Sequence, residues 1–254
     1  MCLVCNAENA ACRASRRGFF KSFGVASAGF ALLGSGVAMG GFASIAFAKN
    51  QKAPPKPQNA VSPEAALALL MAGNARYVEG VTKRHDFRHE REPLTKGQNP
   101  YAAILSCADS RIAPEYAFDA GRGDLFVCRV AGNFANDDVI ASLEYAVAVL
   151  DTPLVMVLGH EACGAIDATI KSLKDNTTLP GHLPSLVAAL APAVKASEGE
   201  SGDPLANAIR QNVILNVEKL KGAAPILKAK ADEKKLNVVG ATYRLTDGHV
   251  ALVT

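Results

Sequence analysis

Three apolar runs in the middle of the chain, each followed by small and polar residues, constrain the fold more than any other feature. They are Tyr101–Leu105, Leu125–Val130 and Leu154–Leu158. Short runs that stay apolar without alternation are typical of strands buried on both faces. Segments with helical patterns lie between the second and third runs and after the third. This arrangement predicts an α/β fold with a mostly parallel central sheet flanked by helices.

The remainder of the chain from residue 62 extends the same pattern. Ser62 and Pro63 are expected to cap and begin a helix that runs to Val78 and forms an N-terminal helical arm. The polar, basic stretch 79–100 is expected to be an extended surface segment or a subunit contact. Other helices are expected at 138–150, 164–173, 204–221 and 225–231, strands at 237–243 and 249–253, and a polar loop at 175–184. A single domain therefore covers residues 62–254.

The first 48 residues resemble a twin-arginine export signal. Ser15-Arg-Arg-Gly-Phe-Phe-Lys21 precedes the Gly/Ala-rich run Ser22–Phe47, which ends in the small-x-small pattern Ala46-Phe-Ala48. We expect the twin-arginine (Tat) machinery to export the chain, to the periplasm or beyond, with cleavage near Ala48. An uncleaved membrane anchor is the alternative, but so many Gly, Ala and Ser residues make a weak span, and no stable anchor is expected. Residues 49–61 are a Pro-rich linker.

Charge is distributed unevenly along the chain. Four of the 27 basic residues and one of the 24 acidic residues lie in the first 48, so the rest carries 23 of each. Non-specific binding to nucleic acid depends on clustered Lys and Arg. A domain with no net charge gives no reason to expect a nucleic-acid partner.

Two of the loops that follow the apolar runs contain metal-ligand side chains. Cys107 lies in Cys107-Ala-Asp-Ser-Arg111, and His160 and Cys163 lie in Gly159-His-Glu-Ala-Cys163-Gly. Because the carboxyl ends of parallel strands meet at one edge of a sheet, these side chains are expected to come together. A Cys₂His set suits one Zn²⁺ per chain. Cys128 would complete a closed structural site, but it precedes the end of its run and is expected to point into the packing of the sheet.

Asp109 and Arg111 distinguish an open metal site from a closed one. The Asp109 carboxylate is near enough to serve as a fourth ligand or to pair with Arg111, and such pairs are strongly directional. If Arg111 holds it, the fourth position is left to water, whose pKa zinc lowers towards neutrality. The chemistry indicated is attack of metal hydroxide on a small electrophile, with Asp109 orienting the hydroxide and Arg111 keeping Asp109 ionised.

These motifs together resemble those of the β-class carbonic anhydrases. The resemblance covers about residues 62–254 and rests on Cys107–Arg111, Gly123–Val127, Ala131–Asn133, Gly159–Gly164 and Val239–Ala241. It implies reversible hydration of CO₂ to bicarbonate and a proton by a catalytic domain that forms a homodimer or homotetramer.

Carried over by position, the resemblance assigns a role to each site residue. Cys107, His160 and Cys163 would bind zinc, and Asp109 and Arg111 would form a catalytic dyad. Gln98 matches a glutamine that helps to bind substrate in the family, often across the dimer interface. Some members carry a Trp three residues before the first zinc cysteine, in a pocket for regulatory bicarbonate. This chain has Ile104 there and no Trp, so we expect an open site at neutral pH.

Two other functions stay open at this point. Close relatives of the family hydrolyse CS₂ or COS with the same ligands, and activity on CS₂ without CO₂ hydration would favour that function. A non-catalytic zinc-binding module is the second alternative, and it predicts that Asp109 and Arg111 are dispensable.

Overall fold

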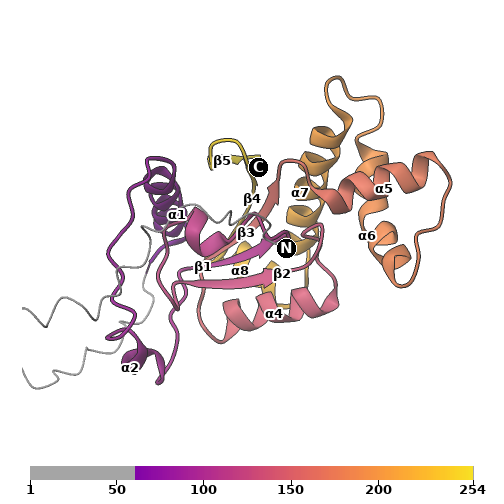
Figure 1. Cartoon of the computed structure of the whole chain (residues 1–254). Coiled ribbons are helices and arrows are strands. Elements are labelled where there is room, and N and C mark those ends of the chain that lie inside the picture. The colour runs from indigo at the N-terminus through magenta and orange to yellow at the C-terminus, as the bar shows by residue number, and fades with distance from the viewer. Residues whose placement is uncertain (1–60, 254) are drawn as a thin grey trace, which may run out of the picture. The chain divides into compact units, whose positions relative to one another are not determined.

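The computed structural model describes residues 61–253, and these form one five-stranded sheet with helices around it (Figure 1). The strands are β1 (Ala102–Ser106), β2 (Leu125–Arg129), β3 (Leu154–His160), β4 (Asn237–Tyr243) and β5 (Val250–Leu252). Their order is β2-β1-β3-β4-β5. The first four are parallel, and β5 pairs antiparallel with β4. The predicted mostly parallel α/β fold is confirmed. The predicted signal at 1–48 and nearly all of the linker at 49–61 lie outside the described residues.

The helices of the described region are α1 (Pro63–Val78), α2 (Arg91–Leu94), α3 (Pro114–Ala117), α4 (Asp137–Ala148), α5 (Gly164–Lys174), α6 (Leu183–Ala196), α7 (Pro204–Lys221) and α8 (Ile226–Asp232). Helices α1 and α7 have the predicted bounds because side chains cap them. Ser62 Oγ accepts from the Ala65 N–H at 3.3 Å, and the Asp203 carboxylate accepts from the N–H groups of residues 205 and 206. No helix within residues 61–253 has the length and apolar character needed to cross a membrane.

Three helices and the end of one strand differ from the sequence prediction. Helices α2, α3 and α6 were not predicted, and α6 begins at Leu183, inside the predicted loop 175–184. The alanine-rich sequence of α6 favours a helix, but the proline within it obscures the pattern. Strand β3 extends two residues beyond Leu158, because Gly159 and His160 continue to pair with β4. His160 is therefore the last residue of a strand rather than part of a loop.

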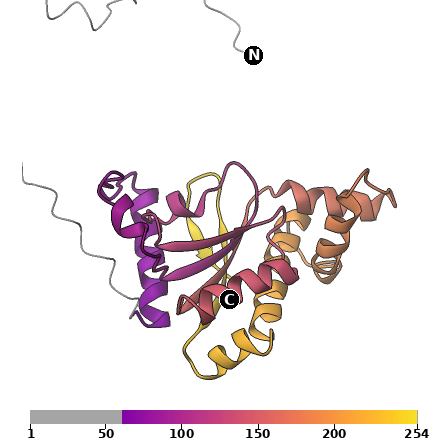
Figure 2. The same cartoon turned by 90° about the horizontal axis from the view of Figure 1, so that it is seen from below.

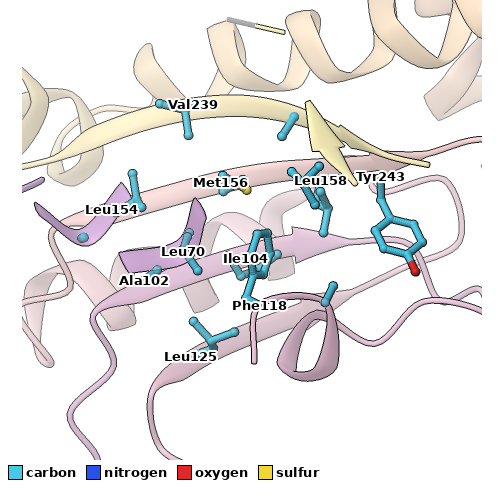
Figure 3. Packing of buried hydrophobic residues seen from close by; sticks show 14 of the residues in the cluster. Leu70, Ala102, Ile104, Phe118, Leu125, Leu154, Met156, Leu158, Val239 and Tyr243 are labelled. Carbon is cyan, nitrogen blue, oxygen red and sulfur yellow. The ribbon is translucent and has the colours of Figure 1, made fainter. Parts of the chain in front are cut away.

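Alternating side chains of the central strands supply two separate cores. Side chains on one face, including Ile104, Met156 and Leu158, pack against α1 and α3 around Phe118 (Figure 3). Those on the other face, including Leu105 and Val157, pack against α4, α7 and α8. The sheet is thus covered on both sides, which explains why its strands read as unbroken apolar runs. Because β2 is an edge strand, most of its residues are only partly buried.

Helices α5 and α6 pack on each other and on α7, beside the sheet rather than over it (Figures 1 and 2). They enclose a third cluster that contains Cys107 and Cys163, together with Ile166, Leu190 and Ile209. The ends of β1 and β3 therefore lead directly into a buried cluster of side chains shared with this pair of helices.

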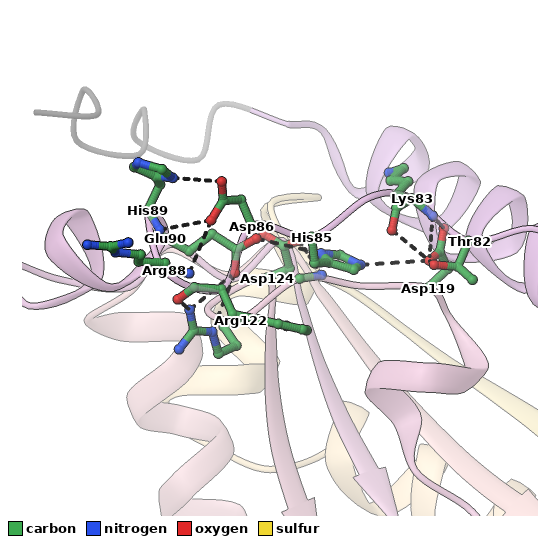
Figure 4. A network of polar contacts seen from close by, with 12 residues as sticks. Thr82, Lys83, His85, Asp86, Arg88, His89, Glu90, Asp119, Arg122 and Asp124 are labelled. Carbon is green, nitrogen blue, oxygen red and sulfur yellow. Dashed lines mark hydrogen bonds and ion pairs between the residues drawn. The ribbon is translucent and has the colours of Figure 1, made fainter. Parts of the chain in front are cut away.

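A network of charged groups fastens the segment after α1 to the body (Figure 4). The buried Asp119 carboxylate accepts from Arg76 Nε at 2.5 Å and from the Lys83 N–H at 3.1 Å. The His85 ring lies between Asp119 and Glu90, at 3.9 and 3.7 Å. This segment lies on the surface, in agreement with the sequence prediction.

A substitution in α1 tests how closely that helix packs. A Cβ on Gly73 would lie 1.9 Å from the Phe118 carbonyl oxygen, a backbone atom that cannot turn away. Gly73→Ala should therefore lower the free energy of unfolding by about 1–3 kcal/mol, the usual cost of overpacking, although alanine favours a helix by about 1 kcal/mol over glycine. Urea unfolding measures the change. Unchanged or increased stability would show that α1 can move away from α3 at little cost.

Candidate metal centre

Three side chains at the carboxyl ends of β1 and β3 form one buried cluster. Cys107 follows β1 directly, His160 ends β3, and Cys163 precedes α5. Their sulfur and nitrogen donor atoms all lie within 4.8 Å of one another. Both thiols and the imidazole are nearly inaccessible to solvent. The structure brings together the three ligands predicted from the sequence.

The two thiols affect each other's ionisation. The hydrogen bond from Cys163 lowers the pKa of Cys107 to about 4, against the opposing effect of burial, with His160 helping. The same contact raises the pKa of Cys163 well above its usual value, and burial adds to this. One thiolate thus forms readily, and a bound cation would favour the second, because thiolates are the metal-binding form.

The His160 ring is oriented by its neighbours. Its Nδ1 lies 2.8 Å from the Glu161 carbonyl oxygen, which assigns the hydrogen to Nδ1. Glu161 is itself fixed, because its N–H donates to the Tyr243 carbonyl at 3.0 Å and its carboxylate accepts from the Leu245 N–H at 2.9 Å. His160 Nε2 is buried and has no hydrogen-bond partner. Burial lowers the pKa of His160, but the adjacent Cys107 sulfur outweighs it and raises the pKa overall.

Asp109 is held by Arg111 beside this cluster. Its Oδ1 accepts from the Arg111 backbone N–H and from Nε, both at 2.9 Å, and its Oδ2 accepts from Nη2 at 2.6 Å. Arg111 Nη2 also donates to the Ala162 carbonyl at 3.0 Å, which ties the pair to the loop before Cys163. Arg111 holds the pKa of Asp109 well below its usual value, and Asp109 raises the pKa of Arg111. Asp109 Oδ2 is 3.9 Å from His160 Nε2.

Arg129, at the end of β2, contacts the loop that carries Cys107 and Asp109. Its Nε donates to the Cys107 carbonyl at 2.9 Å, and its Nη2 donates to the carbonyls of Asp109 and Ile112 at 2.6 and 3.0 Å. One guanidinium thus holds three carbonyl groups of the loop. Sequence reasoning missed this role. The feature of the sequence that could have indicated it is a single arginine near the end of the otherwise apolar run Leu125–Val130.

Gln98 and Cys128 lie apart from the cluster. Gln98 is exposed and precedes the amino end of β1, whereas Cys107 follows its carboxyl end. The described chain therefore does not bring Gln98 to its own metal-ligand cluster. Cys128 is half-buried against the core formed with α4 and is outside the cluster.

Comparisons with known proteins agree with this geometry. The family model described as carbonic anhydrase matches residues 102–250. Carbonic anhydrase 2 of Mycobacterium tuberculosis is 37% identical over 193 residues, which cover 75% of this chain and 93% of that protein. The carbonic anhydrase of Mycolicibacterium smegmatis is 36% identical over 192 residues, with the same coverage. The solved structure of the β-carbonic anhydrase CcaA superposes with a TM-score of 0.57 at 28% identity, covering 73% of this chain and 94% of that one. The chain belongs to the β-carbonic anhydrase family.

Members of this family use zinc, and the donors present here fit that ion. Two cysteines and one histidine form one of the ligand sets of catalytic zinc sites. The buried His160 Nε2 without a partner is the independent sign, because a buried polar atom normally has one. Cys107, His160 and Cys163 are thus the residues that would hold zinc in this carbonic anhydrase.

The contacts of Arg129 lead to a prediction. Arg129→Lys keeps the charge but cannot reach three carbonyls at once, so the loop with Asp109 should lose its fixed position. We expect kcat to fall by roughly 10–100-fold, the usual effect of altering such supporting contacts around a metal site, with little change in bound zinc. CO₂ hydration kinetics and metal analysis measure the two effects. Arg210→Lys, which alters a surface pair with Glu200, is the matched control. Equal rates in both variants would contradict the role of Arg129.

Proposed function

We propose that this enzyme catalyses the reversible hydration of CO₂ to bicarbonate and a proton, with one zinc held by Cys107, His160 and Cys163. The observation that carries the proposal is the position of Asp109, fixed on Arg111 with Oδ2 3.9 Å from the metal-facing nitrogen of His160. A purely structural zinc site has no need of an oriented carboxylate at this place. Zinc bound to these three donors supplies a Lewis acid that makes water nucleophilic at neutral pH.

The residues around the cluster divide the remaining tasks. Asp109 Oδ1 accepts two hydrogen bonds from Arg111 and Oδ2 accepts one. An ionised carboxylate only accepts, so the lone pair left on Oδ2 would accept from a hydroxyl group and orient it towards CO₂. Arg111 keeps the Asp109 carboxylate ionised and holds it on the guanidinium, so that it does not occupy the fourth position beside Cys107, His160 and Cys163. A carboxylate of Asp109 that is paired with Arg111 is the arrangement expected of a metal site whose fourth position is left to water.

Gln98 reaches a substrate site only if another subunit supplies it. It lies at the opposite end of β1 from Cys107, so we place it in the site of a second copy, in a homodimer or homotetramer. Mixing Gln98→Ala with Asp109→Asn chains tests this. Random pairing into dimers should restore about a quarter of all sites, and the mixture should exceed the activity of either variant alone. No recovery, in oligomers shown to have exchanged subunits, would contradict this placement.

For localisation, we propose export by the twin-arginine pathway and cleavage near Ala48. The support is the sequence Ser15–Lys21 with the apolar run that follows it. A double variant, Arg16→Lys with Arg17→Lys, should stay in the cytoplasm when it is expressed in cells that have the twin-arginine machinery. N-terminal sequencing of the exported wild type should begin at Lys49, whereas a chain that still begins at residue 1 would indicate an uncleaved anchor.

Stopped-flow CO₂ hydration by the chain beginning at Lys49, with zinc measured on the same sample, tests the activity. One zinc per chain with fast hydration that a chelator abolishes is the expected result. One zinc per chain without hydration would support the three ligand assignments but contradict CO₂ as the substrate. CS₂ and COS would then be assayed. Hydration unaffected by both Asp109→Asn and Arg111→Ala would contradict the roles given to these two residues.

A further inference from the structure

Helix α7 contains two buried asparagines in a position that usually carries apolar side chains. Asn212 and Asn216 are one helical turn apart, among Ile209, Val213 and Val217, and both are nearly inaccessible. Asparagine is a poor helix former, and burial of an amide is unfavourable unless its polar atoms are hydrogen-bonded. Their place in the core therefore calls for specific partners.

Those partners lie in the loop that follows β2. Asn212 Nδ2 donates to the Gly132 carbonyl at 2.9 Å, and Asn216 Oδ1 accepts from the Ala135 N–H at 2.7 Å. Asn216 Nδ2 donates to the Asn212 backbone carbonyl at 2.8 Å and to its Oδ1 at 3.1 Å, so the two amides fix each other. Lys219, on the same side of α7, donates to the Ala135 carbonyl at 2.6 Å. The helix thus holds both ends of the loop 132–135.

The loop in turn contacts a metal-ligand sulfur. The Gly132 N–H donates to Cys107 Sγ at 3.3 Å. Gly132 has φ +82°, and a Cβ there would lie 2.7 Å from Leu190 of α6. Glycine is therefore required for the loop to lie this close to α6 with its N–H directed at the sulfur. Asn212 holds the same residue from the other side.

We propose that Asn212 and Asn216 are positioning residues that set how strongly Cys107 donates electrons to the metal, by fixing the Gly132 N–H against its sulfur. A hydrogen bond to a thiolate withdraws electron density from it, and supporting contacts of this kind tune both metal affinity and the acidity of bound water. The inference rests on the proposed zinc site. It adds an electronic role for a helix that supplies no ligand.

Cobalt substitution tests the inference by a readout other than activity. Asn212→Leu removes the hydrogen bond to the Gly132 carbonyl and Asn216→Leu the one from the Ala135 N–H, while the Lys219 contact stays. The Gly132 N–H should then lose its fixed position, and Cys107 should become the stronger donor. The near-ultraviolet sulfur-to-cobalt charge-transfer band should move to longer wavelength. The half-time for zinc release to a chelator should change by roughly 10-fold or more. Asn207→Leu is the matched control, because Asn207 lies on the same helix but contacts the carbonyl of Ser201 instead.

The possible outcomes distinguish an effect on the metal site from an effect on folding alone. If the leucine variants lower Tm but leave the cobalt band and zinc release as in wild type, the asparagines serve stability alone and the inference is wrong. If they do not fold, Asn216→Gln keeps donor and acceptor and moves them by one methylene, and the same band shift is expected from it. A wild-type protein that binds no cobalt would reject the metal site of the proposed function, and with it this inference.

Discussion

Cys163→Ser is expected to release the metal and abolish CO₂ hydration. Its sulfur is buried between the end of β3 and the start of α5, within 4.8 Å of the other two donors. Serine is not a zinc ligand in such sites, and two remaining protein ligands hold zinc poorly. Because zinc would join two strand ends, part of the folding free energy is metal-binding free energy. Zinc content should fall from about one per chain to near zero, with a lower Tm.

Cys128→Ser is the control for that experiment. Cys128 is half-buried, and burial raises the pKa of its thiol, but it is not one of the three clustered donors. This variant should retain zinc and activity. A Cys163→Ser protein with bound zinc and wild-type hydration would overturn the ligand assignment, and a zinc-free Cys128→Ser protein would require a different ligand set.

Arg111→Ala is expected to retain zinc but to lose activity by on the order of 100-fold, the effect of misplacing a reacting group by about 1 Å. Arg111 makes three hydrogen bonds to Asp109 and one to the Ala162 carbonyl. The two made by Nε and Nη2 to Asp109, together with the one to Ala162, come from the side chain that alanine lacks. Asp109 would then turn towards the metal and close the site. X-ray absorption at the zinc edge should show an additional carboxylate ligand, and stopped-flow assays should give the rate. Arg210→Ala, another surface arginine paired with an acidic residue, is the matched control.

The pH dependence of the activity lost in Arg111→Ala shows whether the loss comes from the position of the Asp109 carboxylate or from its ionisation. Arg111 lowers the pKa of Asp109 in the folded protein. Without Arg111 that pKa would return towards about 3.9, the value of an unperturbed aspartate, so the carboxylate would still be ionised at neutral pH. Because the released carboxylate would compete with hydroxide for the fourth position on the metal, the loss of activity should become smaller as the pH rises from about 6 to about 9. A loss that stays the same at every pH would show that Arg111 orients Asp109 without keeping the fourth position open, and undiminished activity would remove Arg111 from the mechanism.

Local sequence signals predicted most of the scaffold. Ser62-Pro63 and Asp203-Pro204 marked the starts of α1 and α7 correctly, because capping depends on residues within one turn. The unbroken apolar runs predicted β1, β2 and β3, because both faces of the sheet are covered. The end of β3 and the whole of α6 were missed. Pairing with β4, which is remote in sequence, extends β3 through His160, and the proline within α6 hid a helix that packing stabilises.

The sequence by itself determined the fold class and the chemistry of the site. Cys107, His160 and Cys163 were predicted to meet because parallel strands present their carboxyl ends at one edge, and Asp109 and Arg111 are only two residues apart. The tertiary structure alone decided what holds that site in place. Arg129, Gly132, Asn212 and Asn216 act through hydrogen bonds to backbone groups or to sulfur, between residues up to about 80 positions apart. Backbone partners leave no pattern in the sequence, so these contacts appear only once β2, α6 and α7 are packed together.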